Sequence, residues 1–158
     1  MTLKKTNPMR LLEAAQVAFA AYEYDVSDDD ISAAAVARKL GVDADRVFKT
    51  LVTVSDKKEH FVFVIPGPGE LDLKKAARAA GCRKLEMLPQ RELLGLTGYV
   101  HGGCSPLAMK KPLPTYIDEL AMLFEKIFVS AGQVGVNLEL SPEDLTGMAN
   151  AEFAPLIK

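Results

Sequence analysis

The sequence predicts an α+β fold in which a single mixed β-sheet, curled into a partial barrel, carries helices packed on its outside. Three observations support this prediction. Helical and strand-like segments are mixed along the chain without the strict alternation of a parallel α/β protein. An apolar content of 49% with 25% charged residues is ordinary for a globular protein. The length of 158 residues fits one domain, so we expect a single domain over residues 1–158.

The first half of the chain has clear signals for the starts and ends of its elements. Asn7 followed by Pro8 is typical of a helix start, because proline at the first helical position leaves no needed hydrogen bond unmade. Gly41 supplies a left-handed stop for an alanine-rich helix. Runs of β-branched and aromatic residues on both sides of a short polar turn are typical of a hairpin. In chain order we expect a helix from residue 7 to about 16–18, a strand at 19–24, an acidic loop at 25–30, a helix at 32–40, and hairpin strands at 47–54 and 60–65.

The second half is less regular. Asp72 can cap a helix that Gly81 closes. In the segment 97–118, glycines, two lysines and three prolines interrupt short extended pieces, and loops constrained in this way often carry function. Ser141 opens a helix start that resembles a capping box. The expected elements are a helix at 72–80, a strand at 84–88, a short helix at 89–94, strands at 126–130 and 136–140, and a last helix from 141 toward 148.

The first hairpin strand contains a lysine within its apolar pattern. Pleating places Phe48, Thr50 and Val52 on one face of this strand. Lys49 then shares the other face with Leu51, so it does not lie at a loop tip. Spacing alone leaves two interpretations open, a rim lysine of an edge strand or a functional cation.

Composition and motifs exclude several functional classes. The longest apolar run, 61–65, is too short to span a bilayer, and the chain start does not resemble a signal peptide, so we expect a cytoplasmic protein with no membrane partner. Cys82 and Cys104 are too few and too far apart for a disulfide framework. His60 and His101 lack a second ligand at metal-binding spacing, and no GxSxG or phosphate-loop motif is present. We therefore expect no metal and no cofactor.

Positive charge is concentrated in one stretch of the sequence. The formal net charge of −2 gives no overall attraction for nucleic acid. Between residues 70 and 111, however, eight basic residues accompany four acidic ones. Within this stretch Lys74, Lys75, Lys110 and Lys111 can either contact phosphates or form an ordinary solvated face.

Four adjacent residues, 101–104, have an ordinary interpretation, and three of them also have a functional one. Gly102 and Gly103 are either turn residues or positions where backbone N–H groups approach a ligand closely. His101, beside this pair, fits a surface histidine better than a general base, because no partner residue is visible. Cys104 fits a small buried hydrophobe.

Four ordered sequence blocks favour the functional interpretation of several of these residues. They are GVDADRVFKTLV at 41–52, GELDLKKAARAAG at 69–81, TGYVHGGCSPLAMKKPLPTYID at 97–118 and FVSAG at 128–132. Together they resemble the YbaK/EbsC family and the related editing domain inserted in bacterial prolyl-tRNA synthetases, in the same order and at matching separations. The resemblance covers nearly the whole chain, and the block GGCSPLAMKK is most similar to the YbaK branch.

The resemblance implies a set of site residues. Lys49 matches the indispensable lysine of the family, and the implied substrate-binding residues are Tyr24, Thr50, Gly102, Gly103, Ser130 and Asn137. The chain departs from the family pattern around Gly135. Val134 replaces the usual basic residue before that glycine, and Asn137 replaces an acidic residue after it. We expect these replacements to change the rate or the tRNA preference more than the type of reaction.

The resemblance also implies a function. It implies a trans-editing deacylase that removes Cys from mischarged Cys-tRNA(Pro), and from Cys-tRNA(Cys) as a further substrate, by attack of the substrate's own thiol to give a thiolactone. The implied partners are aminoacylated tRNA and prolyl-tRNA synthetase, with Lys74, Lys75, Lys110 and Lys111 as the tRNA-binding candidates. Two alternatives stay open: an Ala-tRNA(Pro) deacylase that uses water, and a non-catalytic module of the same fold that binds tRNA or a partner.

Overall fold

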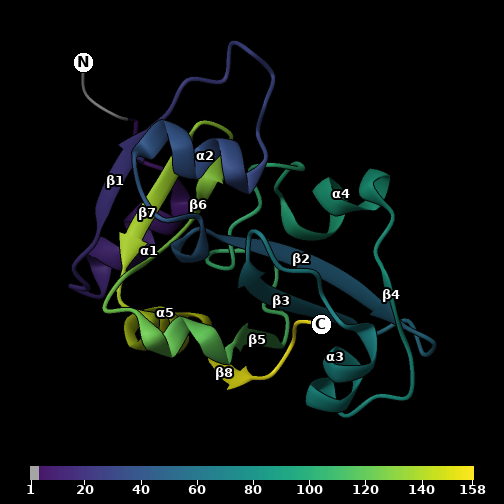
Figure 1. Ribbon diagram of the computed structural model, residues 1–158. Helices are drawn as coiled ribbons and strands as arrows, with labels where there is room; N and C mark the ends of the chain where they lie inside the picture. The colour runs from purple at the N-terminus through teal and green to yellow at the C-terminus, as the bar shows by residue number, and fades with distance from the viewer. Residues whose placement is uncertain (1–3) are drawn as a thin grey trace.

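The computed structural model describes residues 4–158 and places its strands in two sheets (Figure 1). The smaller sheet is antiparallel, in the order β1-β7-β6, and the larger sheet is mixed, in the order β4-β2-β3-β5-β8. The strands are β1 Ala20–Glu23, β2 Phe48–Ser55, β3 His60–Pro66, β4 Leu85–Met87, β5 Thr115–Asp118, β6 Ile127–Gln133, β7 Val136–Leu140 and β8 Ala151–Ala154. The α+β class predicted from the sequence is confirmed, but the strands do not form one sheet.

The two sheets are joined at one corner of the molecule. An isolated parallel bridge pairs Val47, just before β2, with Phe128 in β6. Beyond this bridge the two sheets separate and enclose the main core. The chain therefore forms a curled arrangement with no closed barrel in the described residues.

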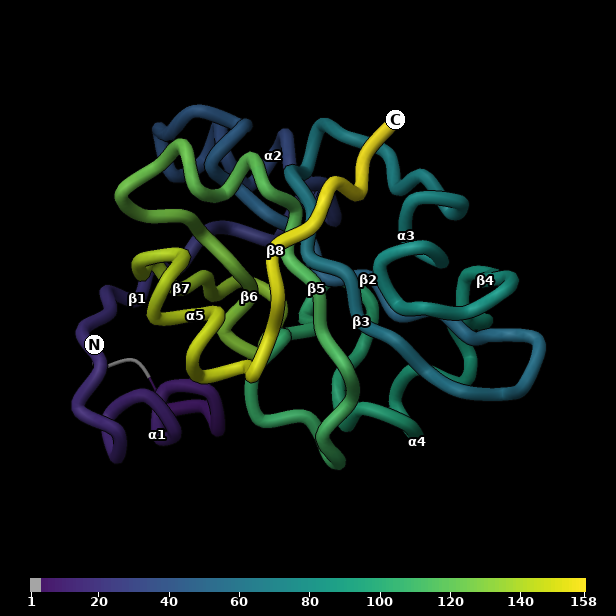
Figure 2. The backbone as a smooth tube through the Cα atoms, turned by 90° about the horizontal axis from the view of Figure 1, so that it is seen from below, coloured from purple at the N-terminus to yellow at the C-terminus, as the bar shows by residue number. Residues whose placement is uncertain are grey.

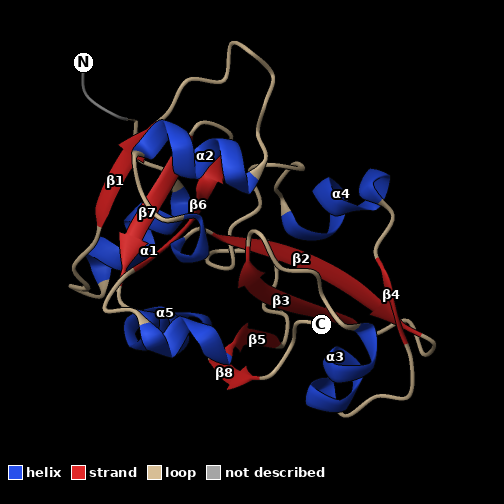
Figure 3. Cartoon of the chain, in the orientation of Figure 1, coloured by secondary structure: helices blue, strands red, loops and turns tan. Residues whose placement is uncertain are grey.

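Some helices lie on the outer faces of the two sheets and others pack against the core between them (Figure 3). The α-helices are α1 Asn7–Ala14, α2 Ala33–Leu40, α3 Leu73–Ala80, α4 Leu93–Thr97 and α5 Pro142–Ala149, and the 3-10 helices are η1 Ala44–Arg46, η2 Gln90–Glu92 and η3 Glu119–Leu123. Within residues 4–158 no helix is both long and apolar enough to cross a membrane.

The alternation of β2 and β3 separates two apolar cores. Phe48 and Val52 of β2 pack into the core between the sheets, as the sequence predicts, together with residues of α1, α5, β6 and β7. Leu51 faces the other way, where Phe63 of β3 packs against α3. A third cluster holds α2 against the outer face of the smaller sheet around Phe128. The larger sheet is thus covered on both faces, and its loops and strand ends are left to form the site.

The caps read from the sequence are confirmed for α3 and α5, and Ser32 caps α2 in the same way, whereas α1 has Thr6 rather than Asn7 before its first residue. The side chains of Ser32, Asp72 and Ser141 accept hydrogen bonds from backbone N–H groups in the first turns of α2, α3 and α5. Gly41 ends α2 with a left-handed φ of 71°. The first helix is shorter than expected, because it ends at Ala14 and Gln16 adopts a φ of 59°.

The last part of the chain adds elements that the sequence did not predict. Strand β5 pairs in parallel with both β3 and β8, so β8 extends the larger sheet at its edge (Figure 2). Asp118, at the end of β5, is 1% exposed and links three segments. Its carboxylate accepts a hydrogen bond from the backbone N–H of Leu120 at 3.1 Å and another from that of Leu156 at 2.9 Å.

Replacing Asp118 with alanine should therefore destabilise the fold. We expect Asp118→Ala to lower the free energy of unfolding by about 2 kcal/mol or more, because two N–H groups lose a charged acceptor in a buried setting. Urea unfolding followed by circular dichroism measures this change. The neighbouring exposed Glu119→Ala is the control, with an expected change within about 0.5 kcal/mol; equal effects of the two substitutions would contradict the role of Asp118.

Candidate active site

A cavity of about 600 Å³ lies beside the first half of β2, within the size range of ligand pockets in proteins. Its walls come from the loop before α2, from α2 itself, from the start of β2, from the 101–104 loop and from the smaller sheet. Of the seven site residues implied by the family resemblance, six line it: Tyr24, Lys49, Thr50, Gly102, Ser130 and Asn137. Segments far apart in the sequence thus meet at one place.

The floor of this cavity is an open strand edge. On the side away from β3, β2 pairs with β4 only through residues 53–55, and the bridge to β6 lies at Val47. The four residues 48–51 all line the cavity. Since consecutive side chains of a strand point to opposite faces, a continuous run of four lining residues means that the strand edge itself faces the cavity.

Thr50 presents its main chain to that edge. The carbonyl of Val52 accepts a hydrogen bond from the N–H of Leu88, on the side away from β3. In an antiparallel pair, backbone groups two residues apart point the same way. The N–H and C=O groups of Thr50 therefore point toward the cavity rather than toward β3.

Two side-chain oxygens near the cavity have no partner. Thr50 Oγ1 and Asn137 Oδ1 are buried and make no hydrogen bond within the described residues. Asn137 is only 5% exposed and pairs in register with Ser130, whose Oγ accepts a hydrogen bond from the Gly132 N–H at 3.1 Å. A buried polar atom without a partner costs free energy, so these oxygens are suited to accept hydrogen bonds from a bound ligand.

Lys49 brings a cation to the same cavity. Its side chain is half-buried, and within residues 4–158 its ammonium makes no hydrogen bond and no ion pair. The charge is therefore available to a ligand. The structure places Lys49 at a cavity wall rather than in open solvent.

The two glycines of the 101–104 loop have different positions. Gly102 lines the cavity with a φ of +84°, and a Cβ there would overlap Cδ1 of Ile31, so only glycine fits without strain. Its N–H has no acceptor among the described residues. Gly103 does not line the cavity, and its N–H donates to the carbonyl of Val100 at 3.0 Å. Of the pair, only Gly102 has a donor available.

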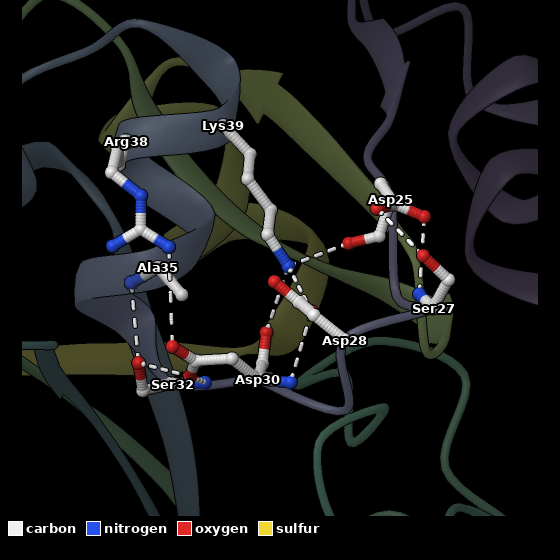
Figure 4. Close-up of polar contacts among 8 residues, drawn as sticks. All are labelled: Asp25, Ser27, Asp28, Asp30, Ser32, Ala35, Arg38 and Lys39. Atoms are coloured by element: carbon white, nitrogen blue, oxygen red, sulfur yellow. Dashed lines mark hydrogen bonds and ion pairs between the residues drawn. The ribbon is translucent and has the colours of Figure 1, made fainter.

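The acidic loop forms a wall of the cavity that sequence reasoning missed. Asp29, Asp30 and Ile31 all line it, although the sequence indicated only a polar loop. Lys39, on α2, holds this loop in place (Figure 4). Its ammonium donates to the Asp25 carbonyl at 2.6 Å, to the Asp28 carboxylate at 2.8 Å and to the Asp30 carbonyl at 3.0 Å.

The Lys39 contacts lower the pKa of the Asp28 carboxyl group, chiefly through the hydrogen bond from Lys39 and next through that from the Asp30 N–H. A carboxyl group whose pKa is lower in the folded state stabilises that state above its ordinary pKa of about 3.9. This contribution is lost only as the pH falls through the lower value of the folded protein. The network is therefore complete at neutral pH.

Two reactive residue types also line the cavity, His101 and Cys104. His101 is exposed, in agreement with its interpretation as a surface residue. Cys104 is 7% exposed, and burial raises its pKa to about 12. Its thiol is thus neutral at physiological pH and is a poor nucleophile. Within residues 4–158, no three His, Cys, Asp or Glu side chains gather as metal ligands.

The four candidate tRNA-binding lysines divide between two faces of the larger sheet. Lys74 and Lys75 lie on α3, which packs against the face of β3 that carries Phe63. The Lys75 ammonium donates to the carbonyl of Ile157 at 2.8 Å. Lys110 and Lys111 lie near α4, which packs into the core on the opposite face, and Figure 1 shows α3 and α4 on opposite sides of β2 and β3. None of the four lines the cavity.

Comparisons with known proteins agree with this fold. The family model of the aminoacyl-tRNA editing domain matches residues 30–148. A protein of Enterococcus faecalis (strain ATCC 700802 / V583), named as a candidate Cys-tRNA(Pro)/Cys-tRNA(Cys) deacylase, EbsC, is 48% identical over 155 residues, which are 98% of this chain and 94% of that protein. A proline–tRNA ligase of Shouchella clausii is 33% identical over 99 residues, 63% of this chain and 17% of the ligase.

A solved structure is similar over its whole length. It is described as a candidate trans-editing enzyme for prolyl tRNA synthetase, with a TM-score of 0.84, 25% identity, and coverage of 98% of this chain and 99% of that one. The chain belongs to the aminoacyl-tRNA editing domain family. The resemblance to the YbaK/EbsC group read from the sequence is confirmed.

The contacts of Lys39 generate a testable expectation. Lys39→Met should speed amide hydrogen exchange across residues 25–32 and lower the free energy of unfolding by about 1–2 kcal/mol, because three acceptors lose a charged donor. Hydrogen-exchange mass spectrometry and urea unfolding measure the two effects.

The adjacent Arg38→Met is a matched control, since Arg38 is 66% exposed and lies 3.9 Å from the Asp30 carboxylate. We expect it to change little, as exposed ion pairs contribute little to stability. If both substitutions leave exchange in the loop unchanged, Lys39 does not hold this wall.

Proposed function

We propose that this protein is a trans-editing aminoacyl-tRNA deacylase that removes Cys from mischarged Cys-tRNA(Pro), with Cys-tRNA(Cys) as a further substrate. The observation that supports this most directly is the single cavity that brings Lys49, the Gly102 N–H and two unpartnered buried oxygens together. The names of the EbsC relative and of the trans-editing structure point to the same substrate class. Because that substrate is made and used in translation, we propose a cytoplasmic location.

The proposed reaction uses the substrate's own thiol. A cysteine thiol has a pKa of about 8.5, so a few per cent is thiolate at neutral pH. The sulfur attacks the carbonyl carbon of the ester, the bond from that carbon to the ribose oxygen breaks, and the ribose oxygen takes up the thiol proton. The products are free tRNA and a cyclic thiolactone. Holding the thiol against the carbonyl replaces a bimolecular encounter with a unimolecular step.

Each cavity group has a proposed role in this step. The Lys49 ammonium lies near the ester and the terminal ribose and stabilises the developing negative charge, together with the Gly102 N–H. Tyr24 and Ser130 shape the amino-acid end of the cavity. The unpartnered oxygens of Thr50 and Asn137 accept hydrogen bonds from the α-ammonium group. Gly103 contributes through the turn that positions Gly102, because its own N–H is already bonded.

The protein offers no thiolate of its own. Cys104 lines the cavity, but its pKa of about 12 keeps it protonated where the enzyme would act. The cysteine of the substrate is more acidic by several pKa units and is the better nucleophile. Selection for Cys would then rest on chemistry, because a cavity that merely admits a side chain rejects an isostere by only about a hundredfold or less.

The acceptor end of the tRNA enters the cavity from one face of the larger sheet. Since α3 and α4 lie on opposite faces of the larger sheet, one acceptor end entering the cavity cannot contact both lysine pairs. We assign the contact to Lys110 and Lys111, because α4 contributes Leu93 to the cavity wall and α3 contributes none. A prolyl-tRNA synthetase is a proposed partner, since part of a proline–tRNA ligase is similar to this chain.

A deacylation panel tests the proposed function. Purified protein is incubated with proline tRNA charged with Cys, Ala or Ser, and the product is trapped to distinguish a ring from a free acid. We expect Cys to be released at least a hundredfold faster than Ala or Ser, with a thiolactone as product. Release of Ala as the free acid would indicate the water-dependent reaction instead, and tRNA binding with no release would indicate a non-catalytic module.

The role of Lys49 gives a second test. We expect Lys49→Ala to keep the fold and to lower the rate of Cys release by at least about a hundredfold, the usual effect of removing one group that stabilises a developing oxyanion. Single-turnover deacylation measures the rate, and circular dichroism checks the fold. Lys58→Ala, at the tip of the hairpin, is the control. A folded Lys49→Ala protein with full activity would refute the assignment.

A further inference from the structure

A second cavity, of about 440 Å³, lies directly across α4 from the first. The residues that line it are Asn7, Leu94, Gly95, Thr97, Gly98, Tyr99, Ala108 and Lys110. The proposed reaction assigns no role to this cavity. Its position next to the first cavity is what makes it informative.

One chain segment, residues 93–101, contributes to the walls of both cavities. Leu93 lines the first cavity and Leu94, the next residue, lines the second. Likewise Tyr99 lines the second cavity and His101, two residues later, lines the first. Because neighbouring residues of the segment 93–101 line the two cavities, both cavities lie against the same short stretch of chain.

The second cavity is positively charged. Among the described residues that line it, Lys110 carries the only formal charge. Its backbone N–H donates to the Thr97 carbonyl at 2.9 Å, and its ammonium lies 3.4 Å from the Gly95 carbonyl, so both ends of this residue are held against α4. A second cation, Arg10, donates to the side chain of Asn7 on the far wall.

The segment 93–101 also carries two exposed apolar side chains, Leu94 and Val100, which we call the ridge. Leu94 is 56% exposed and Val100 is 49% exposed. An exposed apolar ridge beside a cation suits a nucleotide, which presents a flat base to apolar side chains and a phosphate to lysine. Burial raises the pKa of Tyr99 to about 12, and its hydroxyl donates to the Leu107 carbonyl at 2.6 Å.

We propose that the second cavity binds the nucleotide that precedes the terminal adenosine of a tRNA, with Lys110 on its phosphate and the ridge of Leu94 and Val100 against its base. This inference rests on the proposed function, which places the terminal aminoacyl ester in the first cavity. A single strand then runs from one cavity to the next over α4. The lysines of α3 lie on the opposite face and take no part.

Substrates of different length distinguish a role of Lys110 at the second cavity from a role at the first. The esters to compare are Cys-tRNA(Pro), a cysteinyl CCA trinucleotide and cysteinyl adenosine, of which only the first two carry the preceding nucleotide. We expect Lys110→Glu to lower kcat/KM about tenfold on the tRNA and on the trinucleotide, and less than twofold on cysteinyl adenosine. Lys74→Glu, which makes the same charge change on α3, is the matched control and should change none of them more than twofold. With Lys110→Ala, the dependence of log KM on log salt should lose about one unit of slope.

Three outcomes would overturn the inference. If Lys110→Glu lowers kcat/KM equally on cysteinyl adenosine, Lys110 acts at the first cavity. If Lys74→Glu lowers kcat/KM as much as Lys110→Glu, the tRNA lies on α3. If Lys110→Glu lowers kcat/KM on none of the esters, the second cavity does not bind this nucleotide. Wild-type inactivity on all three esters would instead overturn the proposed function. In that case fluorescence anisotropy with a labelled CCA oligonucleotide that carries no amino acid still tests the cavity. We expect Lys110→Glu to weaken binding of this oligonucleotide about tenfold and Lys74→Glu to weaken it less than twofold.

Discussion

The site depends on one constraint, the incomplete pairing of β2. This strand is paired on both sides at its end, where β4 joins it, and on one side only at its start. The unpaired half would normally be a weak point, because an open edge exposes backbone groups that attract other strands. Here α2 and the acidic loop cover it at a distance and leave a cavity in between. The main chain of Thr50 and the side chain of Lys49 face the cavity because no strand of residues 4–158 other than β3 pairs with this half of β2.

A cavity of this kind requires walls that are held from outside. The acidic loop has little apolar content of its own, so packing alone does not fix it. Lys39 compensates by donating to three acceptors of the loop, and Ile31 then contacts the loop around Gly102, where a side chain on the glycine would leave no room. The wall and the Gly102 N–H, the proposed oxyanion donor, are thus coupled through one contact, and movement of the loop would move both.

Local patterns predicted the parts of the fold that are governed by nearby residues. The hairpin followed from β-branched runs on both sides of a turn. Helix α2 followed from its alanine-rich run and glycine stop, and α3 from its cap and glycine stop. The strands β5 and β8 were missed because both are short and pair in parallel with partners that are distant in the sequence. The site residues came from the family resemblance rather than from spacing, and the wall at 29–31 had no local signal. Its stabilising contacts come from Lys39, nine to fourteen residues away.

The replacement of an acidic residue by Asn137 fits a site that selects by reactivity more than by charge. A carboxylate beside the α-ammonium group would strengthen binding of every aminoacyl ester alike, and uniform binding does not discriminate between amino acids. A neutral amide keeps one acceptor and removes that general attraction. Asn137 is 5% exposed and its Oδ1 has no hydrogen-bond partner, so a hydrogen bond from a bound ligand stabilises this oxygen strongly. In the proposed reaction the amide would lower affinity for all aminoacyl esters alike, and the thiol of the substrate would separate cysteine from the other amino acids.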